Sequence, residues 1–283
     1  MNPGIPDDDP SIDYYDSDYP SVQYGPYPEN LDAAFQGQNI AHDVARYQAM
    51  AKAIGGPVLE LCCGTGRVAI PLAADGHKVV GAELSEGQLA RCRANLARVP
   101  AAAGNLELVS ADVSNLDLGR RDFGLVILAF NSLVCIPDYM AQRRAIAVAA
   151  RHLRPDGYLA IDVSNPLTIN VNGDQTPRLM FTRRHADTGR QYSRFATLGP
   201  MSTAQVYEMT GWYDEVGDDA LVRRRPYAMK LRVVHRFELQ LMLEQVGLTV
   251  TRLQGGHRNE PYTTRSMIMF MEARHRAAAR AEP

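Results

Sequence analysis

A short strand followed by a glycine turn limits the fold of this chain more than any other feature. Residues 57–61 form a brief apolar run that predicts a β-strand, and Gly64 and Gly66 follow it directly. Residues 67–74 then have helical character. A strand that enters a helix through glycines leaves backbone N–H groups open at the helix N-terminus, where a ligand can approach closely. The segment therefore predicts a ligand-binding α/β fold.

The alternation of strand and helix continues beyond this turn. Helical periodicity covers residues 31–54 before it, and residues 154–157 read as a turn before the fifth strand. Strands separated by helices at this spacing indicate a parallel sheet covered on both faces. The strands expected after the first are residues 77–82, 106–110, 123–130 and 158–163.

The alternation of strands and helices ends after residue 165, where four segments of alternating apolar and polar residues follow one another without a helix between them. Such a run predicts hairpins, and therefore an antiparallel β insertion. A helix at 237–246 and strands at 248–253 and 267–273 then complete the chain. We expect an acidic arm at 1–30, a core at 31–165 and 236–283, and an insertion at 166–235 that serves as a substrate cover or a dimer interface.

Composition excludes several classes of function. With 46% apolar and 22% charged residues over 283 positions, the chain is typical of an ordinary globular protein. Its basic residues form no clustered stripe, so no nucleic-acid partner is expected, and no apolar run is long enough for a membrane span or a secretion signal. Four cysteines without zinc or disulfide spacing predict no metal site and free thiols in a cytoplasmic protein.

The acidic arm has an unusual composition. Residues 1–32 hold eight of the 32 acidic residues and five of the thirteen tyrosines, and they contain no Lys or Arg. Two interpretations remain open: a lid drawn over the active site by the basic body of the protein, and a solvated tail. Tyr24 and Tyr27 are the arm residues that we expect to contact a substrate.

The glycine turn alone does not identify its ligand. Residues 64–69 fit the G-x-G-x-x-A form of the dinucleotide fingerprint, and Glu83 lies near the distance expected for an acid that binds ribose hydroxyls. A nicotinamide-dependent oxidoreductase is therefore one interpretation. A non-catalytic subunit that binds a cofactor is another.

The sequence around the glycine turn resembles a known protein family. The segment from Val58 to Gly66 is similar to the first motif of the class I S-adenosylmethionine-dependent methyltransferases, whose acid and alternating glycines correspond to Glu60, Cys62, Gly64 and Gly66. The resemblance implies S-adenosylmethionine as cofactor and a Rossmann-like, mostly parallel sheet of seven strands. It also explains the acid at Glu60, because a carboxylate suits the ammonium of the methionine portion and would repel a pyrophosphate.

The resemblance also implies roles for individual residues. Glu83 would bind both ribose hydroxyls, and Leu84 would pack on the adenine ring. Asp112 would accept a hydrogen bond from the adenine amino group, and Val113 would offer its backbone N–H. The remaining expected cofactor contacts are Thr65 in the turn, Phe130 at the methionine end and Arg46 for the methionine carboxylate.

The residues expected at the carboxyl edge of the sheet are the candidates for contact with the methyl acceptor. Asn131 and Tyr139 follow the fourth strand, and His257 lies between the last two strands, with a pKa suited to a general base. We therefore expect an enzyme that methylates a nitrogen or oxygen of a small molecule, such as a natural product or metabolite, with His257 as the catalytic base.

Overall fold

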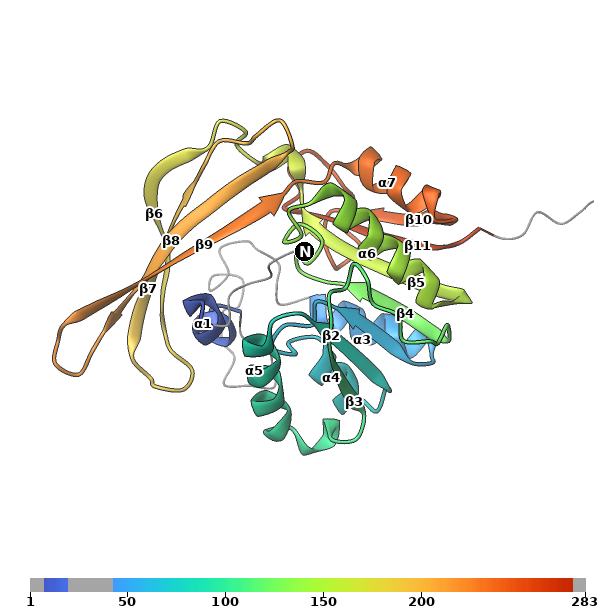
Figure 1. Cartoon of the computed structure of the whole chain (residues 1–283), viewed down its shortest axis with the longest axis horizontal. Helices are drawn as coiled ribbons and strands as arrows, with labels where there is room; N and C mark the ends of the chain where they lie inside the picture. Colours follow the sequence, from blue (N-terminus) through green and yellow to red (C-terminus); the bar gives the residue numbers. More distant parts are fainter. Residues whose placement is uncertain (1–7, 20–42, 277–283) are drawn as a thin grey trace, which may run out of the picture.

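The computed structural model describes residues 8–19 and 43–276, which form two β-sheets with helices around them (Figure 1). The larger sheet has seven strands in the order β10-β11-β5-β4-β1-β2-β3. All its pairings are parallel except those that β11 makes with β5 and β10. The predicted Rossmann-like sheet of seven mostly parallel strands is therefore confirmed. Its strands are β1 (Val58–Leu61), β2 (Val79–Glu83), β3 (Leu106–Ser110), β4 (Phe123–Leu128), β5 (Leu153–Ser164), β10 (Leu248–Gln254) and β11 (Ile268–His275).

Helices cover both faces of this sheet. Alternate residues of the buried strands point to opposite faces, so β1 sends Val58 into one core and Leu59 into the other. One face packs against α3 (Asp43–Ile54), α4 (Ala69–Ala74) and α5 (Glu86–Ala97), and the other against α6 (Tyr139–His152) and α7 (Arg236–Gln245).

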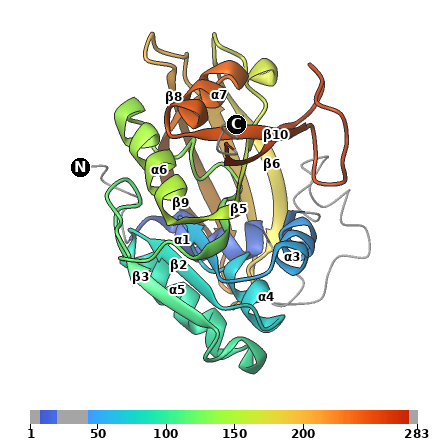
Figure 2. The ribbon, with the colours of Figure 1, turned by 90° about the vertical axis from the view of Figure 1, so that its right-hand side faces the viewer.

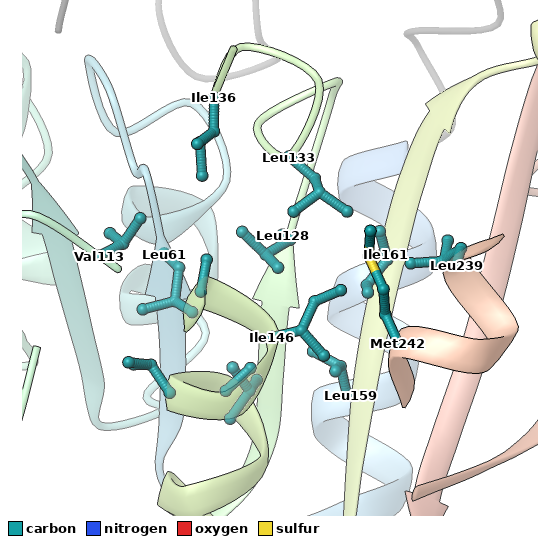
Figure 3. Close-up of a cluster of buried hydrophobic side chains, with 14 of the residues drawn as sticks. Leu61, Val113, Leu128, Leu133, Ile136, Ile146, Leu159, Ile161, Leu239 and Met242 are labelled. Carbon is teal, nitrogen blue, oxygen red and sulfur yellow. The ribbon is translucent and has the colours of Figure 1, made fainter. Parts of the chain in front are cut away.

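The α6 side has the larger hydrophobic core. Leu128 of β4, Ile146 of α6 and Leu159 of β5 lie close to one another in Figure 3 and are all fully buried. Leu239 and Met242 of α7 extend the same core past Ile161 of β5. Because both faces of β1 and β4 are buried, the loops that follow these strands are anchored to a rigid part of the sheet.

One expected turn is in fact part of a strand. Residues 154–157 belong to β5, so their prediction as a turn was wrong. Leu153 pairs with Phe123 at the start of β4, and an added Cβ at Gly157 would lie 2.8 Å from the carbonyl oxygen of Phe123. Tyr158 pairs with Leu125, so residues 154–157 lie opposite Gly124 alone and form an irregularity within β5 instead of a turn outside it.

The predicted antiparallel insertion is a separate four-stranded sheet in the order β6-β7-β8-β9. In Figure 1 it extends from the main sheet as a long twisted wing. Leu231 joins the core on the α6 side, so the base of the wing is anchored there. Its strands are β6 (Asp174–Arg184), β7 (Gln191–Leu198), β8 (Val206–Val216) and β9 (Val222–Arg232).

The acidic arm contains a helix, α1 (Pro10–Asp18), that lies between the wing and α5 (Figures 1 and 2). Asp9 caps it by accepting the Ser11 backbone N–H at 2.7 Å, and Pro10 occupies the first turn, where a missing N–H costs nothing. None of the helices in the described residues is long and apolar enough to span a membrane.

Candidate active site

The carboxyl ends of the parallel strands meet at one edge of the large sheet. Strand order runs from β1 through β2 to β3 in one direction and through β4 to β5 in the other, so the chain reverses its winding between β1 and β4. Ligands of open α/β sheets bind in the crevice outside such a switch point. The glycine turn follows β1, and Phe130 follows β4, on either side of it.

The turn after β1 has the left-handed backbone that glycine usually provides. Gly64 and Gly66 have φ values of 55° and 87°, and Cys62 adopts φ 59° although it carries a side chain. A Cβ at Gly66 would lie 2.7 Å from the Cys92 Sγ atom, so α5 packs directly on the turn. The turn therefore keeps the close approach that the sequence predicted, with Cys62 in place of one glycine.

Glu83 is oriented towards this turn from the end of β2. Its carboxylate accepts the backbone N–H groups of Gly64 at 3.1 Å, Leu84 at 2.9 Å and Ser85 at 3.0 Å. Burial raises the pKa of the Glu83 carboxyl above its usual value, and these three donors oppose that rise. Glu83 thus holds two loops of the carboxyl edge together.

The predicted adenine-binding residues lie at the end of β3. The Asp112 carboxylate accepts the Ser114 backbone N–H at 2.8 Å and is half-buried, whereas Val113 is buried and packs in the core on the α6 side. Asp112 therefore stabilises its own turn while part of its side chain reaches the surface. Leu84 is also half-buried at this edge.

Glu60 is the clearest indication of a site for a cationic group. Its side chain is 3% exposed, and its Oε2 atom has no hydrogen-bond partner among the described residues. Burial raises the pKa of the Glu60 carboxyl well above its usual value, and the Arg67 guanidinium opposes that rise. Arg67 is already bound to Asp43, at 2.9 and 2.5 Å. An unpaired buried acid is the partner that a cationic group requires, so the ammonium of a methionine fits this site.

Asp162 of β5 is a second buried acid near the switch point. It accepts the Phe130 backbone N–H at 2.9 Å and the Tyr47 hydroxyl of α3. Phe130 and Asn131 both have left-handed backbone, with φ of 48° and 65°. Since such conformations are strained for residues other than glycine, the Asp162 contact helps to hold this turn in place.

His257 lies behind Asp162 and not on an open surface. The side chain is 3% exposed, its Nε2 is 3.7 Å from the Asp162 Oδ2, and the ring packs edge-on against Phe270. Burial lowers the pKa of His257, but the Asp162 carboxylate outweighs it and raises the pKa above its usual value. The ring is thus closed off from solvent among the described residues, and its role as a base stays a prediction.

Arg46 and Arg67 have different surroundings from those that the sequence suggested. The Arg46 guanidinium forms an ion pair with Glu272 of β11. Arg67, which the sequence reasoning missed, lies directly after Gly66, and its guanidinium is 4.8 Å from the centroid of the Phe130 ring. Its position next to the last glycine was the one available signal.

Helix α1 also contributes to the site, and the sequence did not predict its contacts. Its Asp16 carboxylate accepts the hydroxyl of Thr65 in the glycine turn at 2.7 Å, together with donors from Arg91 and Asn95 of α5. At its end, the Tyr19 ring lies 4.8 Å from the Phe130 ring in an edge-on arrangement. An arm segment therefore touches both sides of the switch point.

Asp18 of α1 joins the same helix to the wing. Its buried carboxylate accepts the hydroxyls of Tyr192 and Tyr213, each at 2.7 Å, and forms an ion pair with Arg194 at 2.9 Å. The Arg194 guanidinium also donates to the Tyr19 hydroxyl at 2.8 Å. The wing thus fixes the position of Tyr19.

Of the predicted acceptor contacts, the structure describes Asn131 and Tyr139. The Asn131 side-chain oxygen accepts the Ser164 backbone N–H at 2.6 Å, so it braces β5 against the turn after β4. Tyr139 is 41% exposed at the start of α6 and lies beside Arg232. Tyr24 and Tyr27 lie outside the described residues.

Comparison with known proteins agrees with this geometry. Residues 58–157 match the family model described as a methyltransferase domain. The cypemycin N-terminal methyltransferase of a Streptomyces species is 24% identical, over 77% of this chain and 82% of that protein.

Solved structures resemble nearly the whole chain. The CcbJ methyltransferase from Streptomyces caelestis is 25% identical, with a TM-score of 0.71 over 92% of this chain and 98% of that one. CalS10 from Micromonospora echinaspora, an amino pentose methyltransferase solved with S-adenosylmethionine bound, is 20% identical, with a TM-score of 0.66 over 88% of this chain and 98% of that one. These findings set aside the nicotinamide oxidoreductase and the non-catalytic subunit. The chain therefore contains a methyltransferase domain, and it is an enzyme that uses S-adenosylmethionine as its cofactor.

Proposed function

We propose that this enzyme transfers a methyl group to an amine nitrogen of a small molecule. The names of two similar proteins specify an N-terminus and an amino pentose, and both groups carry an amine. The observation that carries the proposal is the contact between Tyr19 and Phe130. It places an aromatic pair beside the turn that follows β4, next to the glycine turn.

Aromatic rings at this place suit a cationic nitrogen. The faces of Tyr and Phe rings attract an ammonium, typically by about 0.5–2 kcal/mol depending on how dry the site is. An amine gains positive charge when it attacks a methyl group, so the same rings favour the charge that develops on the acceptor. Tyr19 is therefore our candidate for the acceptor contact, in place of Asn131, which braces β5, and Tyr139, which lies beside Arg232.

The described residues also suggest how the cofactor is held. Glu83 would bind the ribose hydroxyls, and Asp112 with the Val113 backbone would bind the adenine, beside Leu84. Glu60 would pair with the methionine ammonium, and Arg67 would take the methionine carboxylate that the sequence assigned to Arg46. Bound S-adenosylmethionine supplies a methyl group that is already activated by the sulfonium. The chain needs only to align the acceptor with that group and to exclude water.

The wing and α1 would provide this exclusion. Asp18 attaches α1 to the wing through a buried ion pair, and Asp16 attaches it to the glycine turn. The acceptor side of the switch point is thereby bordered by segments of the same chain, which leaves room for a small molecule in preference to a folded protein. In this proposal the insertion 166–235 serves as a substrate cover.

A panel of paired acceptors tests the proposal. The full chain is incubated with methyl-labelled S-adenosylmethionine and with amino sugars, each matched by the same sugar that carries a hydroxyl in place of the amine. We expect label only in the amine partner, with the N-methyl group located by NMR. Labelling of the hydroxyl partners at equal rates would overturn the choice of nitrogen.

A variant tests the role of the aromatic pair. Tyr19→Ala removes the ring beside Phe130, whereas Tyr19→Phe keeps the ring and loses only the Arg194 hydrogen bond. We expect the alanine variant to raise the KM of the amine and to lower kcat, with the dissociation constant of S-adenosylmethionine nearly unchanged and the phenylalanine variant close to the wild type. An alanine variant with normal acceptor kinetics would contradict this assignment.

A further inference from the structure

The described residues contain a buried group of charges around the turn that follows β4. Two of its acids are Asp43 and Asp162, which are 0% and 2% exposed. Arg67 binds Asp43 with two hydrogen bonds, so its charge is largely committed there. Asp162 has Tyr47 and the Phe130 N–H as hydrogen-bond donors, and neither carries a charge.

Among the described residues, His257 is the group within ion-pair distance of the Asp162 carboxylate that can carry a positive charge. Its Nε2 lies 3.7 Å from the Asp162 Oδ2, and neither ring nitrogen has a hydrogen-bond partner among the described residues. A neutral imidazole with its proton on Nε2 would gain little there, because 3.7 Å is too long for a hydrogen bond and a neutral ring leaves the buried carboxylate charge unbalanced. A protonated ring instead supplies the cation that a buried carboxylate needs.

We propose that His257 is a positioning residue: in its protonated form it holds the Asp162 carboxylate, and through it the strained turn at Phe130 and Asn131. Without this cation, Asp162 would be drawn towards Arg67, the next positive charge that it faces. Arg67 is the residue that we assign to the methionine carboxylate, so cofactor affinity should fall. The inference rests on that assignment and on the cofactor, and it is independent of the acceptor.

Other charged groups face His257 from the elements packed around it. Asp43 and Tyr47 approach from α3, and Arg67 approaches from the segment after the glycine turn. In the loop of His257 itself, the Glu260 carboxylate accepts the Arg258 backbone N–H at 2.7 Å, so it is directed along the loop. Asp162 is therefore the nearest acid on which the charge of His257 can act.

NMR titration of the His257 ring in the wild-type protein is the first test. We expect it to lose its proton above the usual histidine pKa of about 6.5. Asp162→Asn keeps an oxygen for Tyr47 and Phe130 and offers an amide N–H to the ring, so His257 should then titrate below that value. A wild-type ring that titrates at or below the usual value, or one that Asp162→Asn leaves unchanged, would overturn the proposal.

Calorimetry with S-adenosylmethionine is the second test, with His77→Gln as a control on a distant surface turn. Affinity in the wild type and in the control should fall as pH rises through the pKa of His257. In His257→Gln this pH dependence should disappear, and affinity should be lower by about 5- to 150-fold, the usual range for coupled sites. Asp162→Asn combined with His257→Gln should recover part of the loss, because no unpaired carboxylate then remains. Equal affinities and an unchanged pH profile in His257→Gln would refute the coupling, whatever acceptor the enzyme uses.

Discussion

Replacement of Asp16 by alanine should release α1 from the cofactor-binding core. The Asp16 side chain is 6% exposed, and its carboxylate has three donors: the Thr65 hydroxyl at 2.7 Å, the Arg91 Nε at 2.6 Å and the Asn95 amide at 2.9 Å. The variant leaves all three without this acceptor. The guanidinium of Arg91 also binds Asp187, which limits the loss on that side.

The magnitude follows from these contacts. Loss of a charged hydrogen bond costs about 1.5–3 kcal/mol, and each neutral one costs about 1 kcal/mol. Because Arg91 retains a partner, we expect a loss of about 2–4 kcal/mol, below the upper range for a broken buried ion pair. The control is Asp13→Ala on the same helix. Asp13 pairs with Arg225 where both side chains are about half exposed, so its loss should cost less than about 1 kcal/mol.

Hydrogen exchange measures this loss directly, because it reports the opening of α1 apart from global unfolding. Since 1.4 kcal/mol corresponds to a factor of ten, amides of α1 should exchange roughly 30- to 1,000-fold faster in Asp16→Ala. Strands β1 and β4 should keep their protection, because the core beneath them is untouched. If α1 is equally protected in both variants, Asp16 does not hold it and the reasoning is wrong.

Three further predictions concern the core. Glu83→Ala should weaken S-adenosylmethionine binding by about 1.5–3 kcal/mol in calorimetry, and it should also lower the melting temperature because three backbone donors lose their acceptor. Unchanged affinity would remove Glu83 from the cofactor site. Gly66→Ala should lower the free energy of unfolding, measured with denaturant, by about 1–3 kcal/mol more than Gly76→Ala does. A Cβ at Gly66 would lie 2.7 Å from the Cys92 Sγ, whereas the Gly76 site is open and has a similar positive φ. Equal losses of stability in the two variants would show that the left-handed backbone alone causes them and that the contact with Cys92 does not contribute. The raised pKa of His257 predicts a contribution to stability that is complete below about pH 6.5 and is lost as pH rises through the raised pKa. The unfolding free energy of His257→Gln should change less over that range.

The parts of the fold that could be predicted from the sequence are those that local patterns determine. The buried strand before Gly64 is visible as an apolar run that ends at turn residues, and the antiparallel insertion as alternating segments without helices between them. The turn assigned to 154–157 fails for the opposite reason. Its residues favour a reversal locally, but Leu153 and Tyr158 on either side of them pair with β4, so the segment stays within β5 as an irregularity.

The candidate site could be predicted only where a residue follows a strand. Glu83 was found because it ends β2 beside the glycine turn. Arg46 and Arg67 differ only in their tertiary partners, Glu272 and Asp43, and no spacing in the sequence reveals those partners. His257 was recognised as unusual from its loop, yet its burial against Asp162 depends on how the last two strands approach α3.

The contacts of α1 show how an acidic segment acquires structure that its composition does not indicate. Asp16 and Asp18 are two residues apart in a helix, so their side chains point about 200° from each other. One therefore reaches the glycine turn while the other reaches the tyrosines and Arg194 of the wing. A single short helix thus binds the cofactor side and the wing at the same time, and Tyr19 at its end is fixed by both. Since a helix of nine residues is not stable alone in water, its order depends on these two attachments. The loss of either one should then loosen the other, so Arg194→Met in the wing should increase hydrogen exchange at Asp16 although the two side chains do not touch.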